Sequence, residues 1–448
     1  MISGHVLCMD AVGEKPLIPS EIVQFSQKLF TEGKIDSQTT LAYLQSSIDL
    51  QTSVDPSKCD PALRIFANVL RLCEMENRAI EGGFGAAWSP LVSSTIIWFI
   101  GMFMNSYLYV DETYYCPLAQ SYSDLMIPAA PSRASNWCME FILRKVAWNL
   151  SKYYHDVDVV EESISLFLAI VNVRNEKLQH ILELPSFQNL IHMRDVQLDS
   201  KVKRSVYKGL MMATAAFTNI EQRQQCLQRL LEPIGLGYDK MLLEGQQMPH
   251  ESSVRERVIV VLDEITGVAQ GINGQTFPFV YTLMRERIHR LPDMMNLWRN
   301  YLDIQCAILK VLIEMATIQM TNTNARDMAR DFYEICLRAM RCYMEQQHQR
   351  LDKVYGDDEE QPEDVLMIVE LFKKLTVQYI FEPAESSVIT SLGTVVLCNL
   401  MPKMYPILQR FPDIAMPYYK SLNCFLELLV CNDEVSLGLT PSHVDNID

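Results

Sequence analysis

Apolar residues recur at every third or fourth position along most of this 448-residue chain, which is the spacing of one face of an α-helix. A clear stripe near the end of the chain consists of Tyr418, Leu422, Phe425, Leu426 and Leu429. Pro412 and Pro417 precede it. Because proline fixes φ and lacks an N–H, we expect these prolines to end the preceding segment and to set the entry into the helix.

Comparable stripes occur elsewhere. One follows Pro292, which lies 120 residues before Pro412, and comprises Ile304, Ala307, Ile308, Val311, Leu312 and Met315. Two further stripes consist of Phe332, Ile335, Cys336, Ala339, Met340 and Tyr343, and of Val365, Ile368, Val369 and Phe372. A less regular one contains Val159, Ile164, Phe167, Leu168 and Val171. The pattern predicts roughly eighteen to twenty helices and no alternating strands.

The recurrence of helix, break and helix favours a repeat protein. A single helical hairpin leaves one apolar face exposed, whereas stacked hairpins share a continuous core. A spacing of about 40 residues per helix pair is typical of HEAT and armadillo units, so the 120-residue offset corresponds to about three units. We therefore predict an all-α, HEAT-type helical-repeat solenoid, a right-handed superhelix of antiparallel helix pairs. About nine or ten pairs would form one continuous array over residues 19–432, between frayed ends at 1–18 and 433–448.

Composition narrows the classes of function. Glycine is scarce, at 17 residues, and 49% of residues are apolar, which favours helices with ample core. The formal net charge of −16 argues against binding to nucleic acid or to an anionic membrane surface. It suits a basic protein partner, and it equally suits a role in solubility alone.

The chain carries no sign of a leader or a membrane span. Its first residues lack a basic region followed by a long apolar core, so we expect no signal peptide. The most apolar run, residues 96–104, is far shorter than the ~20 residues that cross a bilayer. It predicts a buried helix in a soluble protein.

Catalytic and metal-binding motifs are not recognisable. The GGFG at residues 82–85 follows no strand, so it indicates a hinge between helices rather than a nucleotide loop. The eight histidines are scattered, and the twelve cysteines include no C-x-x-C, which favours a reduced, intracellular setting. We predict no catalytic residue, no metal, no cofactor and no enzymatic activity; an all-α enzyme would need a pocket of converging titratable side chains.

Three charged segments have two interpretations each. The basic runs 201–204 and 285–290 are either solvated helix faces or contacts for an acidic partner. The acidic loop is either a solvated loop whose last carboxylates favour the start of the next helix, or a contact for a basic partner. Its carboxylates are Asp357, Asp358, Glu359, Glu360, Glu363 and Asp364, of which the first four are the candidate partner-binding residues.

Several segments together resemble the exportin 4 family of karyopherin-β (importin-β-like) nuclear transport receptors. They are RLCEMENRAIE (71–81), WFIGMFMNSYLYVDETYY (98–115), FILRKVAWNLS (141–151), FYEICLRAMRCY (332–343), DVLMIVELFKKL (364–375) and FPDIAMPYYKSLNCFLELL (411–429). They occur in the family's order, and the first two are the most specific. The resemblance corresponds to the central to C-terminal portion of a longer family chain, without the N-terminal repeats that make the main Ran clamp.

This resemblance implies a HEAT superhelix that binds protein cargo together with Ran-GTP and shuttles between nucleus and cytoplasm through contacts with nucleoporins. Cargo of the family includes translation factor 5A, which carries the basic modified lysine hypusine, and Smad-type factors. The resemblance implies that the protein exports cargo, imports some transcription factors and catalyses no reaction itself. A HEAT scaffold without Ran-dependent transport is the alternative.

A cationic cargo would need converging carboxylates, because an unpaired buried charge is costly. The candidate cargo-binding residues are Glu74, Glu76, Glu81, Asp111 and Glu112. Glu74 and Glu81 are seven residues apart and so share a helix face. The alternative is that these carboxylates face solvent or pair with Arg71 and Arg78.

Overall fold

The computed structural model describes residues 61–83, 88–107, 116, 131–172, 181–191, 198–317, 326–351, 362–377 and 391–430. Every regular element within these ranges is a helix, so the all-α prediction is confirmed. The chain divides into two compact units, with the boundary between Ala216 and Phe217.

The first unit is built from helices that pack in two rows. Its described helices are α4 (Pro61–Glu81), α5 (Pro90–Tyr107), α7 (Pro131–Lys152), α8 (Val157–Val171), α10 (Pro185–Ile191) and α11 (Ser200–Thr214). Helices α5, α8 and α11 pack in sequence against one another, while α7 packs on both α8 and α10. The aspartate before α8, Asp156, accepts a hydrogen bond from the Val159 N–H at 3.1 Å, which satisfies a donor that the first turn leaves unpaired.

The second unit is also built entirely from helices in its described ranges. Its described helices are α12 (Ile220–Gln247), α13 (Ser252–Gly271), α14 (Phe277–His289), α15 (Leu291–Leu297), α16 (Leu302–Ala316), α17 (Arg326–Leu351), α18 (Glu363–Val377), the π-helix η10 (Thr394–Leu400), α20 (Met401–Arg410) and α21 (Pro412–Val430).

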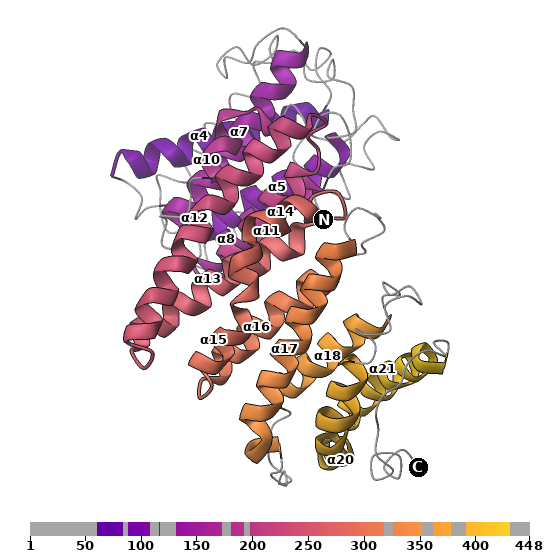
Figure 1. Cartoon of the computed structure of the whole chain (residues 1–448). Helices are drawn as coiled ribbons and strands as arrows, with labels where there is room; N and C mark the ends of the chain where they lie inside the picture. The colour runs from indigo at the N-terminus through magenta and orange to yellow at the C-terminus, as the bar shows by residue number, and fades with distance from the viewer. Residues whose placement is uncertain are drawn as a thin grey trace. The chain divides into compact units, whose positions relative to one another are not determined.

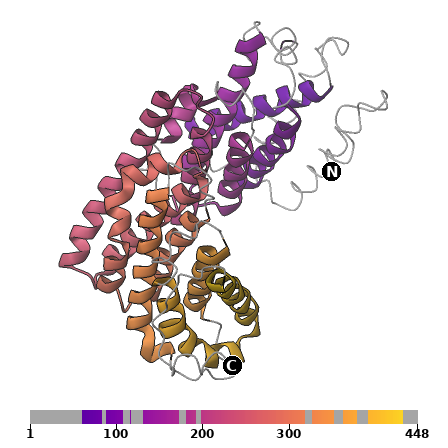
Figure 2. The ribbon, with the colours of Figure 1, turned by 45° about the vertical axis from the view of Figure 1, so that its right-hand side comes forward.

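Two rows of stacked helices run through this second unit. Helices α13, α16, α18 and α21 pack successively in one row, and α12, α14, α17 and α20 in the other. The orange and yellow helices of this unit lie side by side in both views (Figure 1 and Figure 2). Each helix thus contacts its counterpart in the next pair, which is how a helical-repeat protein builds a continuous core. The predicted helical-repeat class is confirmed.

Most predicted stripes are the buried faces of their helices. All members of the two stripes on α17 and α18 are buried, as are all those on α16 except the half-buried Ala307. In α8 only Leu168 is partly exposed among the five predicted positions. The apolar run at 96–104 lies in α5, where Ile96, Ile97, Phe99 and Ile100 are buried, so the buried-helix interpretation is confirmed.

The last helix differs from its prediction in where it begins. Helix α21 starts at Pro412 and contains Pro417 within it, so Pro417 does not mark the helix entry. The earlier start adds Ile414 to a buried face that continues through Tyr418, Ser421 and Phe425. Ser421 is tolerated there because its hydroxyl donates to the Pro417 carbonyl at 2.8 Å. The predicted Leu422 and Leu426 are consequently half-exposed, and the Leu429 side chain lies outside the described residues.

Two loop interpretations can be compared with the structure. Gly82 and Gly83 follow the end of α4, and Gly83 has φ of 83°, a conformation that glycine adopts without steric cost. Glu363 and Asp364 lie in the first turn of α18, where negative charge favours the helix dipole, as predicted. The continuous array over 19–432 and its number of pairs stay predictions.

Candidate functional site

Helix α4 carries three of the five predicted cargo contacts, and it presents them differently. Glu74 is partly exposed and pairs with the Arg78 guanidinium at 3.5 Å and with Arg144 at 4.0 Å. Glu81 is exposed in the last residue of the helix. There its carboxylate adds to the negative end of the helix dipole. These two residues lie on the accessible surface of the first unit, and the predicted pairing with Arg78 is present for Glu74.

Glu76, by contrast, is completely buried. Its carboxylate accepts hydrogen bonds from the Lys145 ammonium at 2.5 Å and from the Tyr153 hydroxyl at 2.8 Å. The Ser93 hydroxyl also donates to it, and that serine accepts a bond from the Trp88 indole N–H at 3.2 Å. With every side of the carboxylate occupied, Glu76 has no face open to a partner. Its role here is structural, in place of the predicted cargo contact.

This buried cluster joins helices distant in sequence, since Glu76, Ser93 and Lys145 come from α4, α5 and α7. The Lys145 ammonium also lies 4.3 Å from the centre of the Trp148 ring. Burial, with the nearby Glu76 charge, raises the pKa of Tyr153 well above its usual value. Burial likewise raises the pKa of the neighbouring Cys73 thiol to about 12. At neutral pH both groups therefore stay protonated, and neither is prepared for acid–base or nucleophilic chemistry.

The remaining predicted contacts fall elsewhere. Asp111 and Glu112 lie outside the described residues, as do Asp357, Asp358, Glu359 and Glu360 of the acidic loop. Of that loop's later carboxylates, Asp364 is buried and accepts a hydrogen bond from the Tyr343 hydroxyl. Of the candidate residues, the structure therefore leaves Glu74 and Glu81 accessible on α4 and buries Glu76, whereas the other six lie outside the described residues.

The basic run at 285–290 forms contacts within the second unit that neither sequence interpretation included. Arg285 and His289 each place a nitrogen 2.8 Å from Oδ2 of Asp331 on α17, and the Tyr281 hydroxyl donates to the same oxygen at 2.8 Å. Partial burial opposes ionisation, but the bonds from Arg285, His289 and Tyr281 prevail and hold the pKa of Asp331 at about 2. These side chains fasten α14 to α17.

Arg287, another residue of this basic run, points toward α12 instead of α17. The Arg287 guanidinium grips Asp239 of α12 through two bonds, Nη2 to Oδ2 at 2.6 Å and Nε to Oδ1 at 3.3 Å. Gly235 leaves room for it, since a Cβ at this position would lie 2.7 Å from the guanidinium carbon. A charged run in one helix thus becomes alternating tethers to α17 and α12, because successive residues of a helix point in different directions.

An open groove of about 260 Å³ lies between α12 and α14. Its lining residues are Gln228, Leu231, Glu232, Leu236, Leu283, Met284 and Arg287. Leu236 and Leu283 are 64% and 41% exposed. The spacing of apolar residues does not predict this groove, and its signal in the sequence is a leucine on the exposed side of each helix, Leu236 and Leu283.

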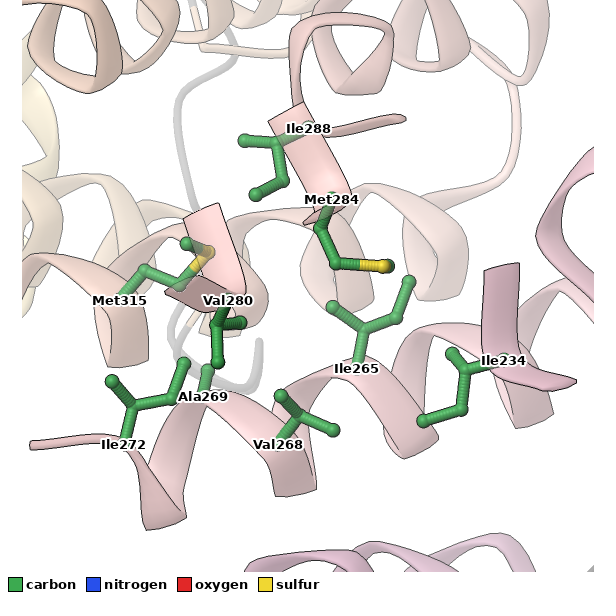
Figure 3. A pocket seen from close by; sticks show the side chains of 9 residues that line it. All are labelled: Ile234, Ile265, Val268, Ala269, Ile272, Val280, Met284, Ile288 and Met315. Carbon is green, nitrogen blue, oxygen red and sulfur yellow. The ribbon is translucent and has the colours of Figure 1, made fainter. Parts of the chain in front are cut away.

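Behind this groove lies a small apolar cavity of about 10 Å³, enclosed by side chains of α12, α13, α14 and α16. Figure 3 shows its nine lining residues, among them Met284, Ile265 and Ile234, arranged around the gap. The space is about that of one water molecule, and a lining without polar partners keeps such a cavity dry. It is a packing gap rather than a ligand site.

The described part of the chain has no cluster of side chains suited to a metal ion. No three His, Cys, Asp or Glu side chains there gather closely enough to hold a metal ion. The helices that the structure describes include none with the length and apolar character required to cross a bilayer. The nine cysteines in the described ranges are free thiols.

Comparison with known proteins identifies the family. The model of the Exportin-4 family matches residues 28–447. Exportin-4 of Dictyostelium discoideum is 20% identical over 349 residues, which cover 75% of this chain and 28% of that protein. The chain therefore spans little more than a quarter of the length of this curated relative. Because the family model covers nearly the whole chain, with the helical-repeat fold in agreement, the chain belongs to the Exportin-4 family of nuclear transport receptors.

Proposed function

We propose that this chain acts as a nuclear export receptor, or as the cargo-holding portion of one, and binds a basic protein cargo together with Ran-GTP. Membership in the Exportin-4 family is the observation that carries the proposal. The net charge of −16 supports a basic partner through long-range attraction and complementarity. In this role the chain shuttles between nucleus and cytoplasm and performs no chemistry itself.

Within this proposal the accessible end of α4 is the cargo contact on the first unit. Glu81 ends the helix, where its charge and the dipole reinforce each other to attract a cation. Glu74 lies two turns earlier on the same face and already attracts Arg78 and Arg144, so a cargo lysine would compete with exposed, weakly held guanidinium groups. Asp111 and Glu112 extend the proposed site beyond the described residues, and Asp357 to Glu360 form a second proposed contact.

Passage through the pore further requires weak contact with nucleoporins. Large apolar side chains that stay exposed support such contacts, and the second unit has three at its end: Tyr405, Met416 and Tyr419 are 65%, 63% and 55% exposed. Single exposed apolar residues are common on protein surfaces, so these serve as the first positions to test for nucleoporin binding.

The decisive experiment measures binding of the purified chain to Ran loaded with a non-hydrolysable GTP analogue, with and without hypusine-bearing factor 5A, at two salt concentrations. Cooperative, salt-sensitive binding of all three proteins is the expected result. Binding of cargo without Ran would restrict the role to holding cargo. Absence of both interactions would favour the alternative, a helical-repeat scaffold without Ran-dependent transport.

A charge-removing variant tests the α4 site within the same assay. Glu74→Gln combined with Glu81→Gln should weaken cargo binding by about threefold to tenfold and flatten its salt dependence, because two rim charges are lost. Glu161→Gln on the exposed face of α8 is the matched control and should leave affinity unchanged. If the unmodified chain, the Glu74→Gln/Glu81→Gln chain and the Glu161→Gln chain bind cargo with equal affinity, Glu74 and Glu81 are not part of the cargo site.

A further inference from the structure

The groove between α12 and α14 leaves apolar side chains exposed to solvent. Its two rims carry Leu236 and Leu283, each more than a third exposed. Leu243, two turns after Leu236 on α12, is also exposed, at 62%, but lies outside the groove lining. Leu236 and Leu283 stand on opposite walls of a concave surface, which is the arrangement that an apolar side chain of a partner can enter.

The charge around this groove is unbalanced. Arg287 lines it, but its guanidinium is neutralised by both oxygens of Asp239. Glu232 is exposed and lies one helical turn before Leu236, and it makes no ion pair with any residue that the structure describes. Of the two charged residues that line the groove, Glu232 is therefore the one without an ion-pair partner among the described residues, and its complement is a positive charge beside an apolar side chain.

The floor of the groove can adapt to what enters it. Met284 lines both the groove and the small apolar cavity behind it, as Figure 3 shows from the cavity side. Methionine is unbranched and has several rotatable bonds, so Met284 can change its rotamer to fit a side chain that enters the groove.

We propose that this groove binds a basic amphipathic peptide segment of a partner protein. An aliphatic side chain enters between Leu236 and Leu283 and rests on Met284, while a lysine or arginine about one turn away pairs with Glu232. The volume of about 260 Å³ is below that of typical small-molecule pockets and suits a few side chains of a docked helix. The inference does not rest on the transport function, because it requires neither Ran nor the α4 carboxylates.

Fluorescence anisotropy with a labelled synthetic helix provides the test. The probe is about three helical turns long, with two leucines on one face and a lysine one turn before them. The full chain should bind it, and Leu236→Ala combined with Leu283→Ala should weaken binding by about tenfold. Leu243→Ala, on the same helix but outside the groove, is the matched control and should bind like the unmodified chain.

A charge exchange separates this occupant from others. Glu232→Lys should weaken binding of the lysine peptide and strengthen binding of its counterpart with glutamate, whereas Glu286→Gln, exposed on α14 but outside the lining, should change neither. All variants alter exposed residues, and circular dichroism should confirm equal thermal unfolding.

Three results would overturn the proposal: no binding of the lysine peptide, equal binding by the Leu236→Ala/Leu283→Ala chain, or indifference of Glu232→Lys to peptide charge. An uncharged phenylalanine–glycine peptide that binds as tightly as the lysine peptide would also overturn it, in favour of an occupant without charge. Since Ran and factor 5A are absent from this assay, its failure is distinguishable from failure of the proposed transport function.

Discussion

Each of the two units contains a carboxylate that bonds to side chains of other helices, Glu76 in the first and Asp331 in the second, and these two carboxylates differ in their access to solvent. In the first unit, Glu76 is 0% exposed and faces a Lys145 side chain that is 1% exposed. In the second, Asp331 is 19% exposed and takes its bonds from Tyr281, Arg285 and His289. Charged hydrogen bonds between a carboxylate and a basic side chain therefore lie in the core at Glu76 and near the surface at Asp331.

This difference in solvent access determines how much each polar contact contributes to the free energy of unfolding. Removing one member of a buried ion pair leaves a charge without solvation, which costs several kcal/mol. Near the surface, water replaces a lost partner and the same change costs little. The first unit should thus be sensitive to substitution at its buried pair, whereas the second should respond at this site mainly to pH.

The largest effect is expected from Lys145→Met. It leaves the Glu76 carboxylate buried with two hydroxyl donors but no counter-charge, and we expect a loss of about 3–5 kcal/mol in the free energy of unfolding, measured by chemical denaturation. Asp331→Asn in the second unit is the comparison and should cost about 1 kcal/mol.

A double variant tests the cause of this loss. Glu76→Gln combined with Lys145→Met removes both charges, and the amide still accepts bonds from Ser93 and Tyr153, so much of the lost stability should return. A Lys145→Met chain as stable as Asp331→Asn would contradict the distinction between the buried and the surface site.

Apolar packing should affect both units alike. A Cβ at Gly209 would lie 2.3 Å from the Phe167 ring in the first unit, and one at Gly245 would lie 2.2 Å from the Trp298 ring in the second. Gly209→Ala and Gly245→Ala should each destabilise by about 1–3 kcal/mol, because both rings are enclosed and cannot move aside freely. Thermal unfolding of the two variants measures this.

Gly101→Ala provides the control for helix propensity. The nearest atom to its added Cβ is Leu166 Cδ1 at 3.9 Å, an ordinary contact. This variant should be neutral or up to about 1 kcal/mol more stable. Losses at Gly209 and Gly245 no greater than at Gly101 would show that the rings yield more easily than the close packing implies.

The smallest expected effect is the acid response of Asp331. Its pKa of about 2 in the fold lies below the ordinary value of 3.8, so the unfolded chain binds the proton more readily. The contribution to stability is therefore complete above about pH 4 and disappears as the pH falls toward 2. Solvent screening reduces it to about 1 kcal/mol.

The acid response can be isolated by comparing two chains. The difference in unfolding free energy between the original chain and Asp331→Asn should shrink between pH 4 and pH 2, which is the window set by the two pKa values. A difference that stays constant across this interval would show that the bonds of Asp331 contribute equally in its protonated form.

Helix periodicity predicted the fold class because burial in a helical repeat follows spacing along one helix at a time. The stripe on α17 from Phe332 to Tyr343 is buried throughout, since a helix packed on neighbours of its own row hides one continuous face. The start of α21 was harder to predict, because Pro417 lies inside the helix although proline more often marks a boundary.

The candidate site was only partly predictable. Glu74 and Glu81 remain accessible on α4, but Glu76 occupies the core because Lys145, 69 residues away, reaches it there. A local signal did exist, since Glu76 has only apolar residues three and four positions away, whereas Arg78 lies within four positions of both Glu74 and Glu81. The partner that buries one of them comes from another helix.

The sequence by itself determined the helical class, the buried stripes, the acidic character and the family, because these depend on residue identity and on spacing of a few positions. Only the tertiary structure decided which charges are available. It joined Arg285 and His289 to Asp331, joined Arg287 to Asp239, and left Glu232 exposed beside an apolar groove. The physical reason is that electrostatic partners are set by distance in space, which the packing of separate helices creates.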